Sequence, residues 1–149
     1  MIRWLLLVAL LLLSTSVAQA GKMPQVIDAT GDPTWAEPIA LAAESWGLDI
    51  KEGRCHRMGH GIPMCKSYAP DAAYAWITIY KNKPLVRINS WWDERTAAWD
   101  AGGQHVRQYI ACHEIGHALG LPERPYEEGC MGGNPAYYWP SEEDLEVVQ

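Results

Sequence analysis

The sequence contains no phenylalanine, although 8 tryptophans and 7 tyrosines occur among its 149 residues. The core must therefore use aromatic rings that also carry a hydrogen-bonding N–H or O–H group. Basic residues are also few, with 12 Lys and Arg against 18 Asp and Glu. The formal net charge of -6 argues against electrostatic binding of nucleic acid, because such proteins cluster Lys and Arg to neutralise phosphates.

Long apolar runs are absent after the first twenty residues, so no later segment is expected to cross a membrane. The N-terminal segment has the parts of a secretory signal peptide: Arg3 is positively charged, residues 4–13 are nearly all apolar, and Ala18-Gln19-Ala20 fits a cleavage site. We expect residues 1–20 to be removed and residues 21–149 to act outside the cytoplasm. An uncleaved membrane anchor is the alternative.

Repeats, low-complexity tracts and linkers are absent as well, which favours one domain over residues 21–149. The composition is that of a globular protein, with 48% hydrophobic and 20% charged residues. The length lies within the range of roughly 100–200 residues that one hydrophobic core serves.

The four cysteines include no CxxC pair, which disfavours a cysteine metal site. An even number of cysteines in an oxidising compartment predicts two disulfides. The sequence alone permits three connectivities. We expect Cys55 to pair with Cys65 across a loop containing Gly and Pro, and Cys112 to pair with Cys130.

Apolar spacing predicts a first helix after the turn Gly31-Asp32-Pro33, with Thr34 as its cap and Gly47 at its end. Its apolar positions are Trp35, Ile39, Ala42, Ala43 and Trp46. Short strands are expected on either side of this helix, at residues 25–29 and 48–51.

A β-hairpin is expected from two runs of β-branched and aromatic residues, 74–80 and 85–91. The sequence Lys81-Asn82-Lys83-Pro84 between them is typical of a turn. Residues 104–119 then have helical character, and residues 140–144 begin a last short helix with acidic side chains in its first turn.

The motif with recognisable chemistry is His113-Glu114-Ile115-Gly116-His117, an HExxH sequence inside the expected helix 104–119. Two imidazoles four residues apart lie on one helical face, so both can bind one zinc ion while Glu114 reaches a water beside it. Gly116 weakens the helix by about 1 kcal/mol relative to Ala, which argues against a purely structural purpose. Incidental histidines on an ordinary helix are the alternative.

Gly120 is placed to end this helix, because glycine readily adopts the left-handed conformation that reverses the chain. Pro122 cannot continue the helix. The chain is therefore expected to fold back and to bring residue 123 towards the metal.

The run of residues 113–123 resembles the metzincin metallopeptidases, whose signature HExxHxxGxx is followed by a third zinc ligand, usually His and sometimes Asp. In this sequence the third position is Glu123. A carboxylate is a competent zinc ligand. A solvated acid at Glu123 is the alternative, and Glu127 and Glu128 are then the substitute ligands.

Met131, within Gly129-Cys130-Met131-Gly132-Gly133, resembles the methionine turn of the same family, an apolar floor beneath the zinc; a gap-filling core methionine is the alternative. Residues 140–148 resemble the matrixin branch, where Ser-x-x-Asp opens the closing helix. The resemblance implies an α+β fold. Its parts are a twisted, mostly parallel sheet with an antiparallel edge strand, a backing helix, an active-site helix and a C-terminal helix.

The resemblance also implies a zinc peptidase mechanism with one catalytic Zn²⁺ ion. His113, His117 and Glu123 would hold the ion, and Glu114 would take a proton from the water that zinc acidifies and pass it to the leaving amine. A Cys112–Cys130 bridge would then tie the active-site helix to the methionine turn.

In the family the substrate lies antiparallel along an edge strand, and residues 85–91 are the candidate for that strand. Residues 134–138 resemble the wall of the pocket that receives the residue after the scissile bond. Tyr137 or Tyr138 either donates a hydrogen bond to the developing oxyanion or, more simply, packs as an amphipathic ring.

Other histidines and tryptophans have simpler interpretations. His56 and His60 could bind a second metal, but an exposed, solvated pair is favoured because no carboxylate accompanies them in sequence. His105 is interpreted as a residue of the helix N-terminus. The tryptophans that could form a peptide or glycan platform are more simply core residues, since the chain has no Phe: Trp91, Trp92 and Trp99.

Two functions from different classes remain. The first is a secreted zinc endopeptidase acting on peptide or protein substrates, for which the intact Glu114 argues. The second is a secreted, metal-stabilised binding module without turnover, which the unusual Glu123 permits. Hydrolysis of a non-protein amide such as cell-wall peptide would use the same chemistry. We expect a monomer with no nucleic-acid partner and no stable membrane insertion after signal cleavage.

Overall fold

The computed structural model describes residues 24–55, 60–93, 97–124 and 128–148, and for residues 97–102 it describes the backbone alone. The expected signal peptide at residues 1–20 lies outside this part of the chain. Within it, no helix is both long enough and apolar enough to cross a bilayer.

The elements follow one another in the order β1-α1-β2-β3-β4-β5-η1-α2-α3. The strands are β1 (Gln25–Asp28), β2 (Ile50–Glu52), β3 (Gly61–Ser67), β4 (Ala75–Tyr80) and β5 (Lys83–Asn89). The helices are α1 (Pro33–Ser45), the 3-10 turn η1 (Ser90–Trp92), α2 (Ala97–Ala118) and α3 (Glu142–Val148).

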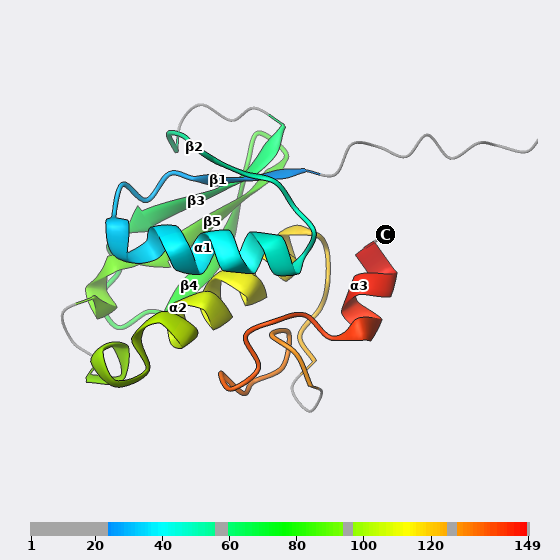
Figure 1. The fold of residues 1–149 in the computed structure, drawn as a ribbon. Helices are drawn as coiled ribbons and strands as arrows, with labels where there is room; N and C mark the ends of the chain where they lie inside the picture. Colours follow the sequence, from blue (N-terminus) through cyan, green and yellow to red (C-terminus); the bar gives the residue numbers. More distant parts are fainter. Residues whose placement is uncertain (1–23, 56–59, 94–96, 125–127, 149) are drawn as a thin grey trace, which may run out of the picture.

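The five strands form one sheet in the order β2-β1-β3-β5-β4, and β4 is the strand that runs antiparallel to its neighbour. Helices α1 and α2 lie side by side on one face of this sheet, while α3 lies beyond the end of α2 (Figure 1). The α+β fold with a mostly parallel sheet and an antiparallel edge strand is therefore confirmed.

The hairpin expected around residues 81–84 is present, but its strands differ from the expectation in position. Lys81 and Asn82 form the turn with positive φ angles of 50° and 60°, which matches the twist of a tight hairpin. Strand β5 consequently begins at Lys83, and residues 90–92 form η1 instead of continuing the strand.

Residues 85–91 are not an edge strand, so the substrate strand expected there was wrong. Strand β5 lies between β3 and β4, and β4 forms the edge beside α2. The order of strands depends on long-range pairing between β3 and β5, and β3 itself was not expected because Gly61 and Pro63 weaken the strand pattern.

The cap of α1 also differs from the expectation. Pro33 occupies the first helical position, where its missing N–H is no loss, and the Oδ1 atom of Asp32 accepts the N–H of Thr34 at 2.9 Å. Asp32 is therefore the N-cap in place of Thr34. At the other end, Gly47 has a φ of 68° and ends the helix as expected.

The core lies between the sheet and the two large helices. Trp35 and Trp46 of the α1 region are buried in it, and the indole N–H of Trp46 donates to the carbonyl oxygen of Cys112 at 3.0 Å. The alternating residues of the sheet that share this core are Val26, Ile62, Met64, Val86, Ile88 and Ala75. The indole N–H of the buried Trp46 thus links the α1 region to the helix that carries the HExxH motif.

Candidate metal centre

The two histidines of the HExxH motif lie one turn apart on the same face of α2. Their rings meet edge to face, with centroids 4.5 Å apart. Helix α2 begins earlier than expected, at Ala97, but Gly103 has non-helical angles and separates the first turns from the regular part. The motif lies in that regular part, where spacing of four residues places side chains on one face.

Each imidazole uses one ring nitrogen for a backbone carbonyl. The Nδ1 atom of His113 lies 2.8 Å from the carbonyl oxygen of Cys130, and the Nδ1 atom of His117 lies 2.9 Å from that of Leu121. A carbonyl oxygen can only accept, so Nδ1 carries the hydrogen in both rings. In the neutral rings, Nε2 therefore presents a lone pair, which is the state that binds a metal.

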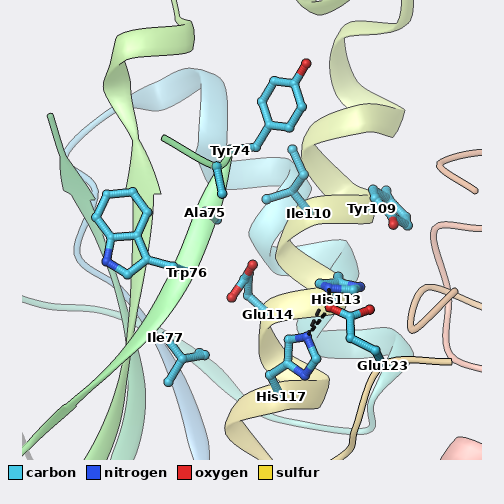
Figure 2. A pocket seen from close by; sticks show the side chains of 11 residues that line it. Tyr74, Ala75, Trp76, Ile77, Tyr109, Ile110, His113, Glu114, His117 and Glu123 are labelled. Carbon is cyan, nitrogen blue, oxygen red and sulfur yellow. Dashed lines mark hydrogen bonds and ion pairs between the residues drawn. The ribbon is translucent and has the colours of Figure 1, made fainter. Parts of the chain in front are cut away.

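Both Nε2 atoms face the carboxylate of Glu123 (Figure 2). Its Oε1 atom lies 3.2 Å from Nε2 of His113 and 3.1 Å from Nε2 of His117, and the two Nε2 atoms are 3.0 Å apart. Three atoms that can all act as acceptors thus converge on one point. Two imidazoles and a carboxylate are a donor set that fits a catalytic zinc ion, and a single cation satisfies all three.

The chain reversal after α2 brings Glu123 to the histidines. Gly120 has a φ of 98°, its N–H donates to His117 at 3.0 Å, and the N–H of Leu121 donates to Gly116 at 3.0 Å. These bonds form the closing motif in which a left-handed glycine ends a helix. The carbonyl oxygen of Leu121, delivered by the same turn, is the one that orients His117.

Met131 packs against α2 at Gly116, inside the HExxH motif. It is fully buried, and a Cβ atom at Gly116 would overlap its sulfur. Packing therefore requires glycine at position 116, in addition to any functional requirement. Only a residue without a side chain lets the segment around Met131 approach the helix this closely. The helix propensity of glycine, which is all that the sequence indicates here, does not predict this contact.

Both expected cysteine pairs form, Cys55 with Cys65 and Cys112 with Cys130. The second bridge joins α2 to the segment that precedes Met131, with its two Cα atoms 5.9 Å apart. Its members flank the site directly, because Cys112 precedes His113 and the carbonyl of Cys130 binds that histidine. The bridge thus holds the acceptor of His113 against the helix.

Glu114 points away from the two histidines, towards β4, as Figure 2 shows. The residue is 7% exposed, and its Oε2 atom is buried without a hydrogen-bond partner among the described residues. Burial raises the pKa of Glu114 to about 7; the nearby His117 lowers it, and the charge of Glu123 raises it further. A carboxylate with a pKa near neutrality is suited to exchange protons with a bound reactant.

A pocket of about 490 Å³ opens between α2 and the edge of the sheet. It is lined on one side by residues 73–77 and on the other by α2, with His113, His117 and Glu123 at its wall. Residues of α2 and of β4 therefore face each other across it (Figure 2).

The edge of β4 that faces this pocket presents backbone groups at alternate residues. The N–H of Asn89 donates to the carbonyl of Tyr74 at 2.9 Å, so Tyr74 pairs directly with Asn89. In antiparallel pairing, hydrogen-bonded positions alternate. The backbone groups of Ala75, Ile77 and Ile79 consequently point to the outer edge, and Ile79 is paired with Pro84, which has no N–H to offer.

Tyr109 is a residue of the site that sequence reasoning missed. It lines the pocket, its hydroxyl donates to the carbonyl of Gly132 at 2.7 Å, and its ring lies 5.7 Å from that of His113. Burial, and then the charges of Glu123 and Glu114, raise the pKa of Tyr109. Its position four residues before His113 was the available signal, since this spacing puts it on the same helical face.

Other expected site residues lie elsewhere. Tyr137 and Tyr138 pack against Trp139 and are not among the residues that line the pocket, which agrees with a packing role. Glu128 is exposed and outside the cluster of the two histidines and Glu123, whereas Glu127 lies outside the described residues.

The simpler interpretations of the remaining histidines also agree with the structure as far as it reaches. His60 is exposed, and His105 packs on Tyr138 with ring centroids 4.7 Å apart. Neither joins a group of potential metal ligands within the described ranges, and His56 lies outside them.

The tryptophans after β5 are half-buried. The ring of Trp91 contacts Tyr68, and the indole N–H of Trp92 donates to the carbonyl of Ala72 at 2.8 Å. The side chain of Trp99 lies outside the described residues.

No protein-family model matches this chain, and no curated protein sequence matches it. Among solved structures, the fold is similar to the crystal structure of a zinc-dependent peptidase from Methanocorpusculum labreanum, with a TM-score of 0.54 and 10% sequence identity. The similarity covers 84% of this chain and 99% of that chain. At this level of identity the comparison concerns the fold alone.

Proposed function

We propose that this protein is a secreted zinc-dependent endopeptidase, with His113, His117 and Glu123 as metal ligands and Glu114 as general base. The observation that carries the proposal is the convergence of three acceptor atoms at the wall of a pocket that is also lined by Glu114, whose buried Oε2 atom has no hydrogen-bond partner among the described residues. Two further facts support it: the resemblance of residues 113–133 to the metzincins, and the fold shared with a zinc-dependent peptidase.

A zinc ion held by these side chains would supply Lewis-acid chemistry, polarising a peptide carbonyl and lowering the pKa of a water. The residues of the chain do the rest. The hydrogen bonds to the carbonyls of Cys130 and Leu121 keep both imidazoles in the required tautomer and orientation.

Glu114 moves the proton. Its ionised Oε2 accepts a proton from the water as the water oxygen bonds to the carbonyl carbon, and it then gives this proton to the amide nitrogen as the C–N bond breaks. No covalent intermediate with the protein is needed.

The edge of β4 is the proposed substrate platform. The outward backbone groups of Ala75 and Ile77 face the pocket, and an extended peptide can add to them as an antiparallel strand. Such addition depends mainly on hydrogen bonds to the peptide backbone and less on the side chains of the peptide. It therefore favours peptides in extended conformation over folded proteins. This strand takes the place that residues 85–91 were expected to have.

Secretion is part of the proposal. The two disulfides suit an oxidising compartment, and the N-terminal sequence has the composition of a signal peptide. Determining the first residue of the protein recovered from the medium of an expressing cell tests this; Gly21 is the expected start.

The decisive experiment compares the wild-type protein with Glu114→Gln. Both should bind one zinc ion per chain, measured by elemental analysis after exhaustive dialysis. Only the wild type should cleave an unfolded protein such as a casein, and chelation of the metal should abolish this cleavage. Zinc bound by both proteins without any cleavage would instead favour the metal-stabilised binding module. Full cleavage by Glu114→Gln would contradict the proposed general base.

A further inference from the structure

Glu123 has little support from its own surroundings. Residues 121–124 have no regular secondary structure, and the side chain of Glu123 is 63% exposed. Its carboxylate contacts the two imidazoles with which it would share a metal. A long, exposed side chain on an irregular segment loses considerable conformational freedom when it is held in one place.

The next residue, Arg124, is held firmly. Its backbone N–H donates to the carbonyl oxygen of Met131 at 3.0 Å. Its guanidinium lies between two carboxylates, 2.7 Å from Glu143 and 3.2 Å from Asp144, and its side chain is only 14% exposed. The planar guanidinium suits such a site because it offers several donors in a fixed geometry.

Asp144 is the fixed end of this contact. Its side chain is 0% exposed, and its Oδ2 atom accepts the N–H of Ser141 at 3.1 Å, while its own N–H donates to the Ser141 hydroxyl at 3.1 Å. These reciprocal bonds cap α3. The segment before Met131 packs closely against the same cap, because a Cβ atom at Gly129 would come within 3.3 Å of Oδ2 of Asp144.

From these contacts we infer that the Arg124–Asp144 ion pair positions Glu123 for the metal, which makes α3 part of the metal centre's support. Arg124 is a positioning residue, because its backbone hydrogen bond to Met131 and its ion pair with Asp144 fix the backbone beside Glu123. The inference rests on the proposed ligand role of Glu123 and on no assumption about which reaction the site performs.

The principal test is a mutant cycle in which the zinc affinity of each variant is measured by competition with a chromogenic chelator. The double variant Arg124→Met with Asp144→Asn removes both charges together, because removing Arg124 alone would leave the buried Asp144 carboxylate without this ion-pair partner, which can prevent folding. The amide oxygen that Asp144→Asn introduces can still accept the N–H of Ser141. We expect zinc affinity to fall by roughly 10- to 100-fold, the usual effect of losing a residue that orients a metal ligand.

The cycle is completed in the background of Glu123→Ala. That single substitution should weaken zinc binding strongly, because it leaves two protein ligands. Adding the Arg124 and Asp144 substitutions to it should then change the affinity by less than about twofold, since pairs that act through one residue are non-additive. Equal losses in both backgrounds would overturn the inference, because they would mean a general effect on the fold.

Two control variants separate positioning from stability. Lys66→Met breaks ion pairs with Asp32, the N-cap of α1, and with Asp93, which follows η1. It should lower stability without changing zinc affinity, because none of these residues belongs to the cluster of metal ligands. Arg124→Lys keeps one charge near Asp144 and should restore part of the affinity. Wild-type zinc affinity in the Arg124→Met, Asp144→Asn protein would refute the positioning role.

The two proposals fail in different ways. Zinc binding without peptide cleavage would contradict the endopeptidase proposal, and the cycle would still decide whether Arg124 positions Glu123. Wild-type zinc affinity in Glu123→Ala would overturn the inference, and it would leave peptide cleavage to be judged with Glu114→Gln.

Discussion

The Nδ1 atom of His113 lies 2.8 Å from the carbonyl oxygen of Cys130, whose sulfur is bonded to Cys112, the residue before His113. The carbonyl that orients His113 therefore belongs to Cys130, which the disulfide joins to the residue before His113. The orientation of this imidazole should depend on the bridge.

Replacing Cys112 and Cys130 together by Ala should lower both stability and zinc affinity. Loss of a bridge that closes a loop of this size costs about 3 kcal/mol of unfolding free energy. Zinc affinity should fall because the carbonyl of Cys130 is no longer held against α2. The matched control replaces Cys55 and Cys65, which should lower stability alone. Denaturant unfolding and chelator competition measure the two effects, and equal zinc affinity in both double variants would contradict the prediction.

Gly116→Ala should destabilise the protein although Ala favours helices by about 1 kcal/mol over Gly. The new methyl group overlaps the sulfur of Met131 and comes 3.0 Å from the ring of Trp46, and both side chains are buried. Overpacking of this kind costs about 1–3 kcal/mol. Urea unfolding of the metal-free protein measures it. A rise in stability would show that Met131 moves aside freely, and a smaller penalty in a Met131→Ala background would identify the contact as the cause.

Asp32→Asn should remove a stabilising effect that depends on pH. Burial raises the pKa of Asp32, but the hydrogen bonds from Lys66 and Thr34 outweigh burial and lower it from the usual 3.8 to about 2. A lowered pKa stabilises the folded state above pH 4, and this stabilisation is lost as the pH falls from about 4 to about 2. Because Asp32 is partly exposed and solvent screens its charge, we expect a loss of about 1 kcal/mol.

Asn can keep the capping bond to Thr34, so the variant isolates the charge. The free energy of unfolding of the variant should therefore fall less steeply than that of the wild type between pH 4 and pH 2. Parallel curves over that interval would mean that Asp32 has its ordinary pKa. At the alkaline end, burial lowers the pKa of Lys66, but Asp32 and Asp93 outweigh burial and raise this pKa, so its contribution is lost as the pH rises above 10.5.

Ile77→Pro should weaken peptide binding at the edge of β4. Proline removes an N–H that points outward and leaves the bonds to β5 in place, and edge strands tolerate it. Losing one backbone hydrogen bond should raise KM by roughly 5- to 10-fold while zinc affinity stays unchanged. Ile77→Ala is the control, because it shortens the side chain and keeps the N–H. Equal KM values for the two variants would argue against strand addition.

Asn89→Ala should loosen the rim of the pocket. The buried Asn89 amide donates to the carbonyls of Ala69 and Ala73 at 2.8 and 2.9 Å, and its oxygen accepts the N–H groups of Ala69 and Trp91 at 3.0 and 3.1 Å. Removing it leaves these groups unsatisfied and should cost roughly 2–4 kcal/mol. Ala73 lines the pocket, so KM should rise more than kcat falls. Asn89→Asp keeps the two accepted bonds but places a second oxygen against the carbonyls of Ala69 and Ala73, so it should destabilise the protein at least as much as Asn89→Ala. An unchanged KM in both variants would disprove the link to the pocket.

The elements that sequence reasoning predicted correctly are those governed by local rules. The helical spacing of Trp35 and Ile39, the turn at Lys81 and Asn82, and the left-handed stop at Gly120 each depend on neighbouring residues. The error at the α1 cap was also local, since Pro33 at the first helical position indicates Asp32 as the cap.

The sequence predicts that His113 and His117 lie together, because helix periodicity dictates that they share a face, and that Glu114 lies in the same turn. It also indicated that the chain turns back towards them at Gly120. Tertiary structure decided the rest. The place of β4 at the sheet edge follows from pairing between β3 and β5, and the support of Glu123 follows from Arg124 meeting Asp144 on α3. Such contacts join residues far apart in the chain. They stabilise the protein only when the whole core has brought the elements together, so a local sequence pattern cannot predict them.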